Sequence, residues 1–112
     1  MAFEGDIQKF APVEIDEVGQ LILKARDLLS DPKKWFKGDY VCRRTGAVCI
    51  MGALGARDDN NRPAIVEAAI DRIDALIKLD EPNVGVPFFN DRATTKHSDI
   101  LALLDRAAGA RS

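Results

Sequence analysis

Hydrophobic positions recur along most of the chain at the spacing of an α-helix, with polar side chains between them. Steps of three and four residues place them on one helical face, which predicts helices over residues 14–30, 63–79 and 96–108. Pro32 ends the first of these, because the residue before a proline disfavours the helical conformation. The first strip comprises Ile15, Val18, Leu21, Ile22, Ala25, Leu28 and Leu29. The second strip comprises Ile65, Val66, Ala69, Ile70, Ile73, Leu76 and Ile77, and Leu79 would extend it. The third comprises Ile100, Leu101, Leu103, Leu104, Ala107 and Ala108.

The run of residues 46–56 contains no charged side chain and is expected to be buried. Val48 and Ile50 favour a strand, whereas the methionine, alanines and leucine that follow favour a helix. We expect a buried helix over residues 47–56. A small β-hairpin around residues 40–50 is the alternative.

The composition is that of an ordinary globular chain. Of 112 residues, 46% are hydrophobic and 30% are charged, which is enough apolar surface for one core and one domain. The sequence therefore predicts a mainly α, compact single domain of about four helices with long loops. Residues 1–12 are expected to form an irregular arm and residues 13–109 the helical domain. Loops carrying Trp35 and Phe88–Phe89 are expected to close the core.

Charge is unevenly distributed. Sixteen basic against eighteen acidic residues give a net charge of −2, which disfavours non-specific binding to nucleic acid. Residues 33–44 nevertheless carry five basic side chains and only one acidic side chain, Asp39. Those five are Lys33, Lys34, Lys37, Arg43 and Arg44.

The ends of the chain and its cysteines indicate a compartment. The N-terminus lacks the basic and apolar regions of a secretory signal, and no uncharged run has the length of a membrane span. We expect a cytoplasmic protein, in which Cys42 and Cys49 stay reduced. Their spacing matches no common metal-binding pattern, and His97 is the only histidine, so neither a metal nor a cofactor is expected.

The basic segment is the best candidate for a binding surface. Cations interleaved with aromatic side chains can dock on an acidic protein surface or on a phosphate backbone. Alternatively, Trp35 and Phe36 simply cover the core while their lysine neighbours remain solvated. We expect a non-catalytic accessory module that recognises a protein partner, including a second copy of itself. The candidate residues are Lys33, Lys34, Trp35, Lys37, Tyr40, Arg43 and Arg44.

A cysteine-dependent hydrolase or transferase is the alternative function. A thiol needs a base to become a nucleophile at neutral pH, and His97, oriented by Asn90 or Asp91, could activate Cys49. The uncharged surroundings of Cys49 instead favour a buried, unreactive thiol.

Several short patterns occur in a fixed order from about residue 21 to residue 107. They are Leu28-Leu29-Ser30-Asp31-Pro32, Trp35-x-x-Gly38, Cys49-x-x-Gly52-Ala53-Leu54, Phe89-Asn90-Asp91 and Thr95-x-x-x-Asp99-Ile100. In this order the chain resembles a family of small uncharacterised bacterial and phage proteins, a domain of unknown function. The resemblance implies a compact helix-rich fold and no particular activity, substrate or catalytic residue.

Overall fold

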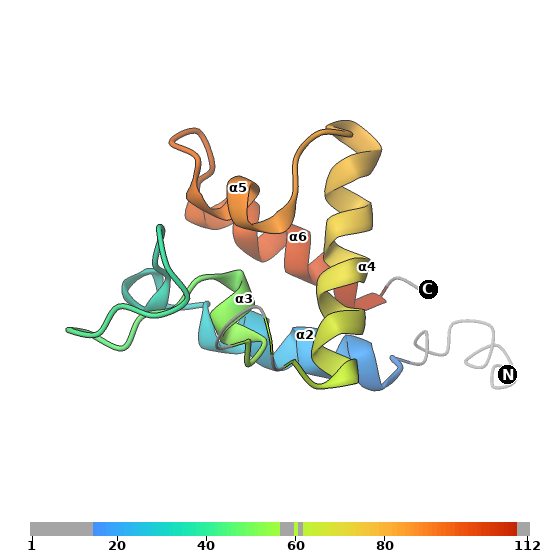
Figure 1. Cartoon of the computed structure of the whole chain (residues 1–112), viewed down its shortest axis with the longest axis horizontal. Coiled ribbons are helices and arrows are strands. Elements are labelled where there is room, and N and C mark those ends of the chain that lie inside the picture. The colour runs from blue at the N-terminus through green and yellow to red at the C-terminus, as the bar shows by residue number, and fades with distance from the viewer. Residues whose placement is uncertain (1–14, 57–59, 61, 110–112) are drawn as a thin grey trace, which may run out of the picture.

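Three long helices meet around a common core in the computed structural model, which describes residues 15–56, 60 and 62–109 (Figure 1). Helix α2 (Glu17–Leu28) packs against α6 (His97–Gly109), and α4 (Ala64–Asp80) contacts both. Three short helices complete the order: η1 (Pro32–Lys34), α3 (Ile50–Ala53) and α5 (Val86–Asp91). The expected mainly α fold class is confirmed. The arm expected over residues 1–12 lies outside the described residues.

Local sequence signals explain where the early helices begin. The carboxylate of Asp16 accepts a hydrogen bond from the backbone N–H of Gly19 at 2.8 Å, which caps α2. The carboxylate of Asp31 accepts a hydrogen bond from the backbone N–H of Lys33 at 2.9 Å, which caps η1. Pro32 is the first residue of η1, where the fixed backbone angle of proline suits a helix. The strip of hydrophobic residues that predicted a helix at 63–79 forms α4, displaced by one residue.

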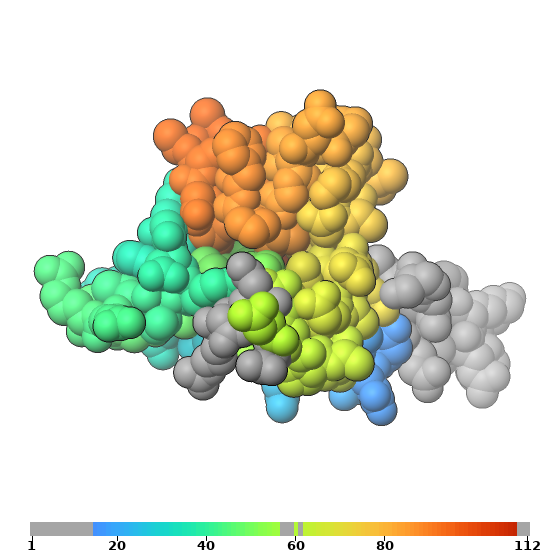
Figure 2. Space-filling model, viewed as in Figure 1, coloured from blue at the N-terminus to red at the C-terminus, as the bar shows by residue number. Residues whose placement is uncertain are grey.

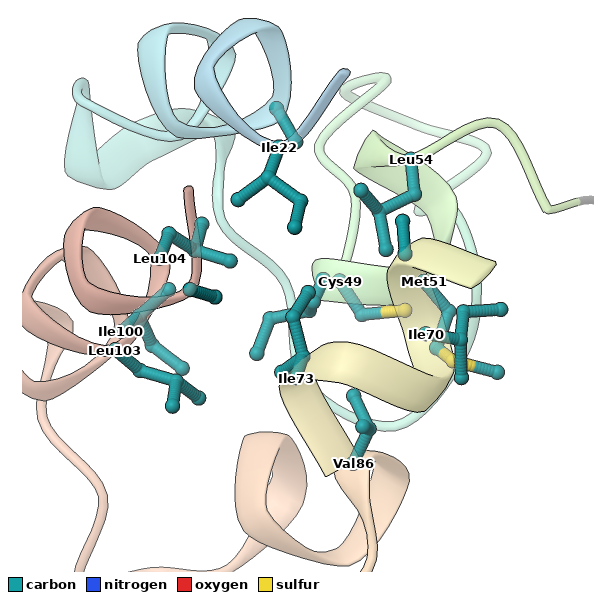
Figure 3. Packing of buried hydrophobic residues seen from close by; sticks show 14 of the residues in the cluster. Ile22, Cys49, Met51, Leu54, Ile70, Ile73, Val86, Ile100, Leu103 and Leu104 are labelled. Atoms are coloured by element: carbon teal, nitrogen blue, oxygen red, sulfur yellow. The ribbon is translucent and has the colours of Figure 1, made fainter. Parts of the chain in front are cut away.

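The core is built of aliphatic side chains contributed by α2, α3, α4, α5 and α6 (Figure 3). Helices α2 and α6 approach closely at Gly19, where a Cβ atom would collide with the carbonyl oxygen of Ala108. The largest fully buried apolar side chains are Ile22, Leu29, Ile50, Leu54, Ile73, Ile100, Leu104 and Val86.

A buried cation ties α4 to the start of α2. The Arg72 side chain is only 4% exposed, and its guanidinium donates to both carboxylate oxygens of Asp16, at 3.0 and 2.6 Å. A buried charge needs such a partner, because leaving it unpaired costs several kcal/mol. Asp16 therefore fixes the position of α4 as well as capping α2.

The prediction of a helix over residues 47–56 is correct only in part. The helix spans Ile50–Ala53, and the residues before it are extended. Val48 forms an antiparallel bridge with Val41 and a parallel bridge with Trp35, so the alternative of a small hairpin describes this part better. Gly46, at φ +81°, makes the turn between the paired segments.

The prediction that Phe88 and Phe89 close the core from a loop needs correction. Both lie in α5, which the sequence did not indicate. On this helix Phe89 packs against the core, whereas Phe88 is 60% exposed. Adjacent residues of a helix point in different directions, and in α5 only Phe89 faces the core.

Candidate functional site

Residues 33–44 follow α2 in the chain, and side-chain hydrogen bonds attach them to α5 and to the turn after it. The indole nitrogen of Trp35 donates to Oδ1 of Asn90 at 2.8 Å, and the ring packs against the edge of the core. The expected role of Trp35 in covering the core is therefore what the structure shows, and its indole N–H is already used within the chain.

Asn90 is the centre of this attachment. Its side chain is completely buried, and its Oδ1 also accepts from the backbone N–H of Ile50 at 3.2 Å. Its amide nitrogen donates to the carbonyl oxygen of Phe36 at 3.0 Å and to Asp91 at 2.8 Å. One side chain thus joins the basic segment, α3 and α5. The sequence had suggested Asn90 only as a residue that orients His97; its place in the Phe89-Asn90-Asp91 pattern was the one signal of a larger role.

Lys37 and Gly38 strengthen the same attachment. The ammonium group of Lys37 donates to the carbonyl oxygens of Arg92 at 2.9 Å and Thr95 at 3.0 Å. It also lies 5.1 Å from the centre of the Trp35 ring, a cation–π geometry. The backbone N–H of Gly38 donates to Asp91 at 2.9 Å. Lys37 was predicted as a binding residue, but its donors face its own chain.

The other four cations of the segment are presented to solvent. Lys33, Lys34, Arg43 and Arg44 are exposed, and none forms an ion pair with another described residue. Residues 41–46 form the tip that projects farthest at one end of the molecule in Figures 1 and 2. The predicted binding residues therefore separate into two anchors, Trp35 and Lys37, and four exposed charges.

Tyr40 lies between these two groups. Its side chain is half-buried against the core, and its hydroxyl accepts from the guanidinium of Arg62 at 3.0 Å. Next to it, Val41 remains 43% exposed. The segment consequently carries one exposed apolar side chain, Val41, near its exposed cations.

A cavity of about 280 Å³ opens between this segment, α3 and α5. Two carboxylates line it, Asp39 and Asp91, and among the described residues of its lining there is no lysine or arginine. Sequence reasoning had not connected Asp39 with a site. The other lining residues that matter here are Tyr40, Cys49, Met51 and Pro87.

Cys49 borders the cavity but is poorly suited to nucleophilic chemistry. It is 7% exposed, and its sulfur accepts a hydrogen bond from the N–H of Gly52 at 3.4 Å. Burial raises the pKa of the Cys49 thiol above its ordinary value, and the charge of Asp91 raises it further. The thiol is therefore protonated at neutral pH, whereas the nucleophile would be the thiolate.

His97 does not line this cavity. Its Nε2 lies 2.6 Å from the carbonyl oxygen of Leu29, and its ring is tilted at 43° to the Trp35 indole, with 5.9 Å between centroids. A carbonyl oxygen only accepts hydrogen bonds, so Nε2 carries the proton in this arrangement. The structure thus brings Asp91 to the Cys49 cavity and directs His97 elsewhere.

The second cysteine, Cys42, differs from the first. The hydroxyl of Thr45 and nearby backbone N–H groups hydrogen-bond to its sulfur and hold the pKa of Cys42 below its ordinary value. Among the described residues, no group of three or more His, Cys, Asp or Glu side chains is arranged to hold a metal ion.

Comparison with known proteins gives a family and nothing more specific. No curated protein matches the chain significantly, and no solved structure does. Within the described part of the chain, no helix has the length and apolar character that crossing a membrane requires. A family model matches residues 14–110, nearly the whole chain. The protein accordingly belongs to the family described as a family of unknown function (DUF6197).

Proposed function

We propose that the protein is a non-catalytic binding module that recognises an acidic protein surface through residues 33–44. One observation carries this proposal. Four exposed cations without ion pairs among the described residues stand on a segment that Trp35 and Lys37 hold firmly to the core.

A held segment favours binding for a physical reason. A flexible loop loses conformational freedom when it binds, and this loss opposes association. Here the hydrogen bonds from Trp35, Lys37 and Gly38 already restrict the segment when the protein folds, so less conformational freedom is lost on binding. The exposed Val41 adds apolar contact beside the charges, as a protein interface requires.

A nucleic acid fits this surface less well. Single-stranded nucleic acid is bound by stacking bases on exposed aromatic rings between cations. Here the only tryptophan in the chain is half-buried and hydrogen-bonded to Asn90, and the chain as a whole is negatively charged. An acidic protein surface needs neither a free aromatic ring nor a large positive excess.

The proposal includes a cytoplasmic location and a bacterial or phage origin. Both cysteines are free thiols, as expected in a reducing compartment. No cofactor enters the proposed function, because binding needs only side chains of this segment.

Charge reversal tests the proposal. The variants are Lys33→Glu with Lys34→Glu, and Arg43→Glu with Arg44→Glu. The matched control is Lys24→Glu with Lys96→Glu, two exposed lysines outside the segment. The probe is a fluorescent peptide of alternating glutamate and leucine, and its anisotropy gives the dissociation constant. We expect each variant in the segment to weaken binding by about tenfold, because rim charges contribute modestly each. The control should bind like the natural protein.

Melting temperatures of all variants establish that they are folded. Equal affinity of the natural protein and the two segment variants would contradict the proposal. A duplex DNA probe that binds more tightly than the peptide, with a steep dependence on salt, would instead assign the segment to nucleic acid.

A further inference from the structure

The segment of residues 33–44 and the end of α5 carry two sets of opposite charges that do not form ion pairs with each other. Arg43 and Arg44 are exposed on the projecting turn, while Asp39 and Asp91 line the neighbouring cavity. Among the described residues, no ion pair joins either set to a side chain of opposite charge. The described part of the chain therefore leaves both sets available to a partner.

The turn that carries the arginines is ordered by its own backbone. The N–H of Gly46 donates to the carbonyl oxygen of Cys42 at 2.7 Å, and the N–H of Cys42 donates to the carbonyl oxygen of Ala47 at 2.7 Å. The hydroxyl of Thr45 accepts from the N–H of Ala47 at 3.2 Å. These bonds order the short hairpin of residues 41–46, which forms the tip seen in Figures 1 and 2.

The cavity suits the side chain of an arginine. Its volume of about 280 Å³ is roughly nine times the share of one water molecule in the liquid, enough for one long side chain. Met51, Pro87 and the Tyr40 ring offer apolar walls to a methylene stem, and the two carboxylates can accept from a guanidinium. Asp91 is fixed in place by Gly38 and Asn90.

A partner carrying only negative charge would satisfy this end of the molecule incompletely. Its carboxylates would pair with the arginines but would face Asp39 and Asp91 across the same interface. Like charges opposed across an interface cost binding energy. The better partner therefore presents cations and carboxylates together, in the same arrangement.

A second copy of this chain is such a partner. In an interface with two-fold symmetry, both subunits use the same patch, so each feature must find its complement on that patch. Asp39 and Arg43 are close in sequence and belong to the same segment, which allows the two reciprocal contacts to form at once.

We propose that the acidic partner of residues 33–44 is a second copy of the chain, in a symmetric dimer. The Arg43–Arg44 turn of each protomer enters the other's cavity and pairs with Asp39 and Asp91. This inference rests on the function proposed above, since it uses the same segment, and it names the partner.

A charge-swap experiment tests the dimer. The first variant carries Arg43→Glu and Arg44→Glu, and the second carries Asp39→Lys. Asp39 is exposed and its carboxylate accepts from the N–H of the adjacent Tyr40, so this change leaves the core untouched. Sedimentation equilibrium over a series of concentrations gives the dimer dissociation constant. Lys24→Glu with Lys96→Glu serves as the control.

We expect the natural protein and the control to dimerise, and each segment variant alone to dimerise at least about tenfold more weakly. Mixing the two variants should restore the dimer. The glutamates on the turn of one protomer then meet the lysine introduced at position 39 in the other cavity, while the second contact keeps its natural residues. Melting temperatures confirm that each variant is folded.

Three results would overturn the inference. The first is a natural protein that remains monomeric at every concentration. The second is a dimer that survives Arg43→Glu with Arg44→Glu, and the third is a mixture of the two variants that fails to associate. Free arginine that shifts the NMR signals of Asp39 and Asp91 in a monomeric protein would assign the cavity to a small cationic ligand instead. The acidic peptide assay decides separately whether the proposed function survives, because it requires no second copy.

Discussion

The indole nitrogen of Trp35 donates a hydrogen bond to Oδ1 of Asn90 over 2.8 Å, although 55 positions separate the two residues in the chain. This bond connects the segment that carries the exposed cations to α5. Both residues occur in short sequence patterns, Trp35-x-x-Gly38 and Phe89-Asn90-Asp91. Their hydrogen bond helps to hold the segment that carries the exposed cations beside the cavity that Asn90 lines.

Replacing Asn90 with alanine should destabilise the protein by about 3 kcal/mol, measured by urea denaturation. The substitution leaves the buried N–H of Ile50 and the partly buried carbonyl oxygen of Phe36 without their partner, and each buried group left so costs about 1–3 kcal/mol. Trp35→Phe keeps these two bonds and should cost less.

The exposed Asn83 provides the control for this substitution. Asn83→Ala should change stability by no more than about 0.5 kcal/mol, as is usual for surface positions. A loss at Asn90 no greater than the loss at Asn83 would contradict the central role given to Asn90.

Replacing Gly52 with alanine should lower stability by about 1–2 kcal/mol. A Cβ atom at Gly52 would overlap the backbone carbonyl oxygen of Tyr40, which cannot move as easily as a side chain. Overpacking of this kind costs about 1–3 kcal/mol, which exceeds the gain of up to about 1 kcal/mol from better helix propensity. Gly109→Ala, where no atom lies within 4 Å of the added carbon, should be neutral or slightly stabilising. Thermal denaturation of the two variants checks this difference, and equal melting temperatures would refute it.

The two thiols should differ in reactivity. Iodoacetamide should label Cys42 first, since hydrogen bonds from Thr45 lower the pKa of the Cys42 thiol and favour its thiolate. Burial raises the pKa of Cys49, so labelling of Cys49 should be slow and should begin only at higher pH. Peptide mass spectrometry over a pH series measures both rates. Thr45→Ala should shift the Cys42 profile to higher pH. Faster labelling of Cys49 than of Cys42 at neutral pH would instead revive the cysteine-dependent enzyme.

The ion pair between Glu81 and Arg92 should give stability that depends on pH. Arg92 donates to both carboxylate oxygens, at 2.7 and 2.8 Å, and lowers the pKa of Glu81 below its ordinary 4.5. A carboxyl group with a lower pKa in the folded state stabilises the fold above its unfolded pKa, and this contribution is lost as the pH falls through the folded value.

Calorimetry of the natural protein and of Glu81→Gln tests this sign. The difference between their melting temperatures should be constant near neutral pH and shrink in acid below the ordinary pKa of glutamate. In an Arg92→Gln background, Glu81→Gln should produce no such pH dependence. A difference that grew in acid would contradict the assignment.

The long helices could be read from the sequence because each depends on a local regularity. The strip predicted at residues 63–79 forms α4 at Ala64–Asp80, and that predicted at 96–108 forms α6 at His97–Gly109. The short elements could not be read in this way. Helix α5 has too few residues to show a period, and the residues before Ile50 are held extended by Val41 and Trp35, which lie in an earlier segment of the chain.

The candidate surface shows the same division. The order of residues already indicated a basic segment containing aromatic side chains, because charge and residue type are properties of the chain itself. The sequence did not indicate which of these cations stay exposed, because that depends on groups far away in the chain. Lys37 donates hydrogen bonds to the carbonyl oxygens of Arg92 and Thr95, whereas Arg43 and Arg44 are exposed.

The sequence alone determined the long helices and the location of the positive charge. Helical periodicity and residue composition are properties of residues that are close together in the chain, so no distant contact is needed to recognise them. Only the tertiary structure decided that Asn90 would be fully buried, that Asp39 and Asp91 would line one cavity, and that Cys49 and His97 would face different surroundings. These outcomes depend on contacts between segments far apart in the chain, and pairwise hydrogen bonding and packing fix them only when the whole core has formed.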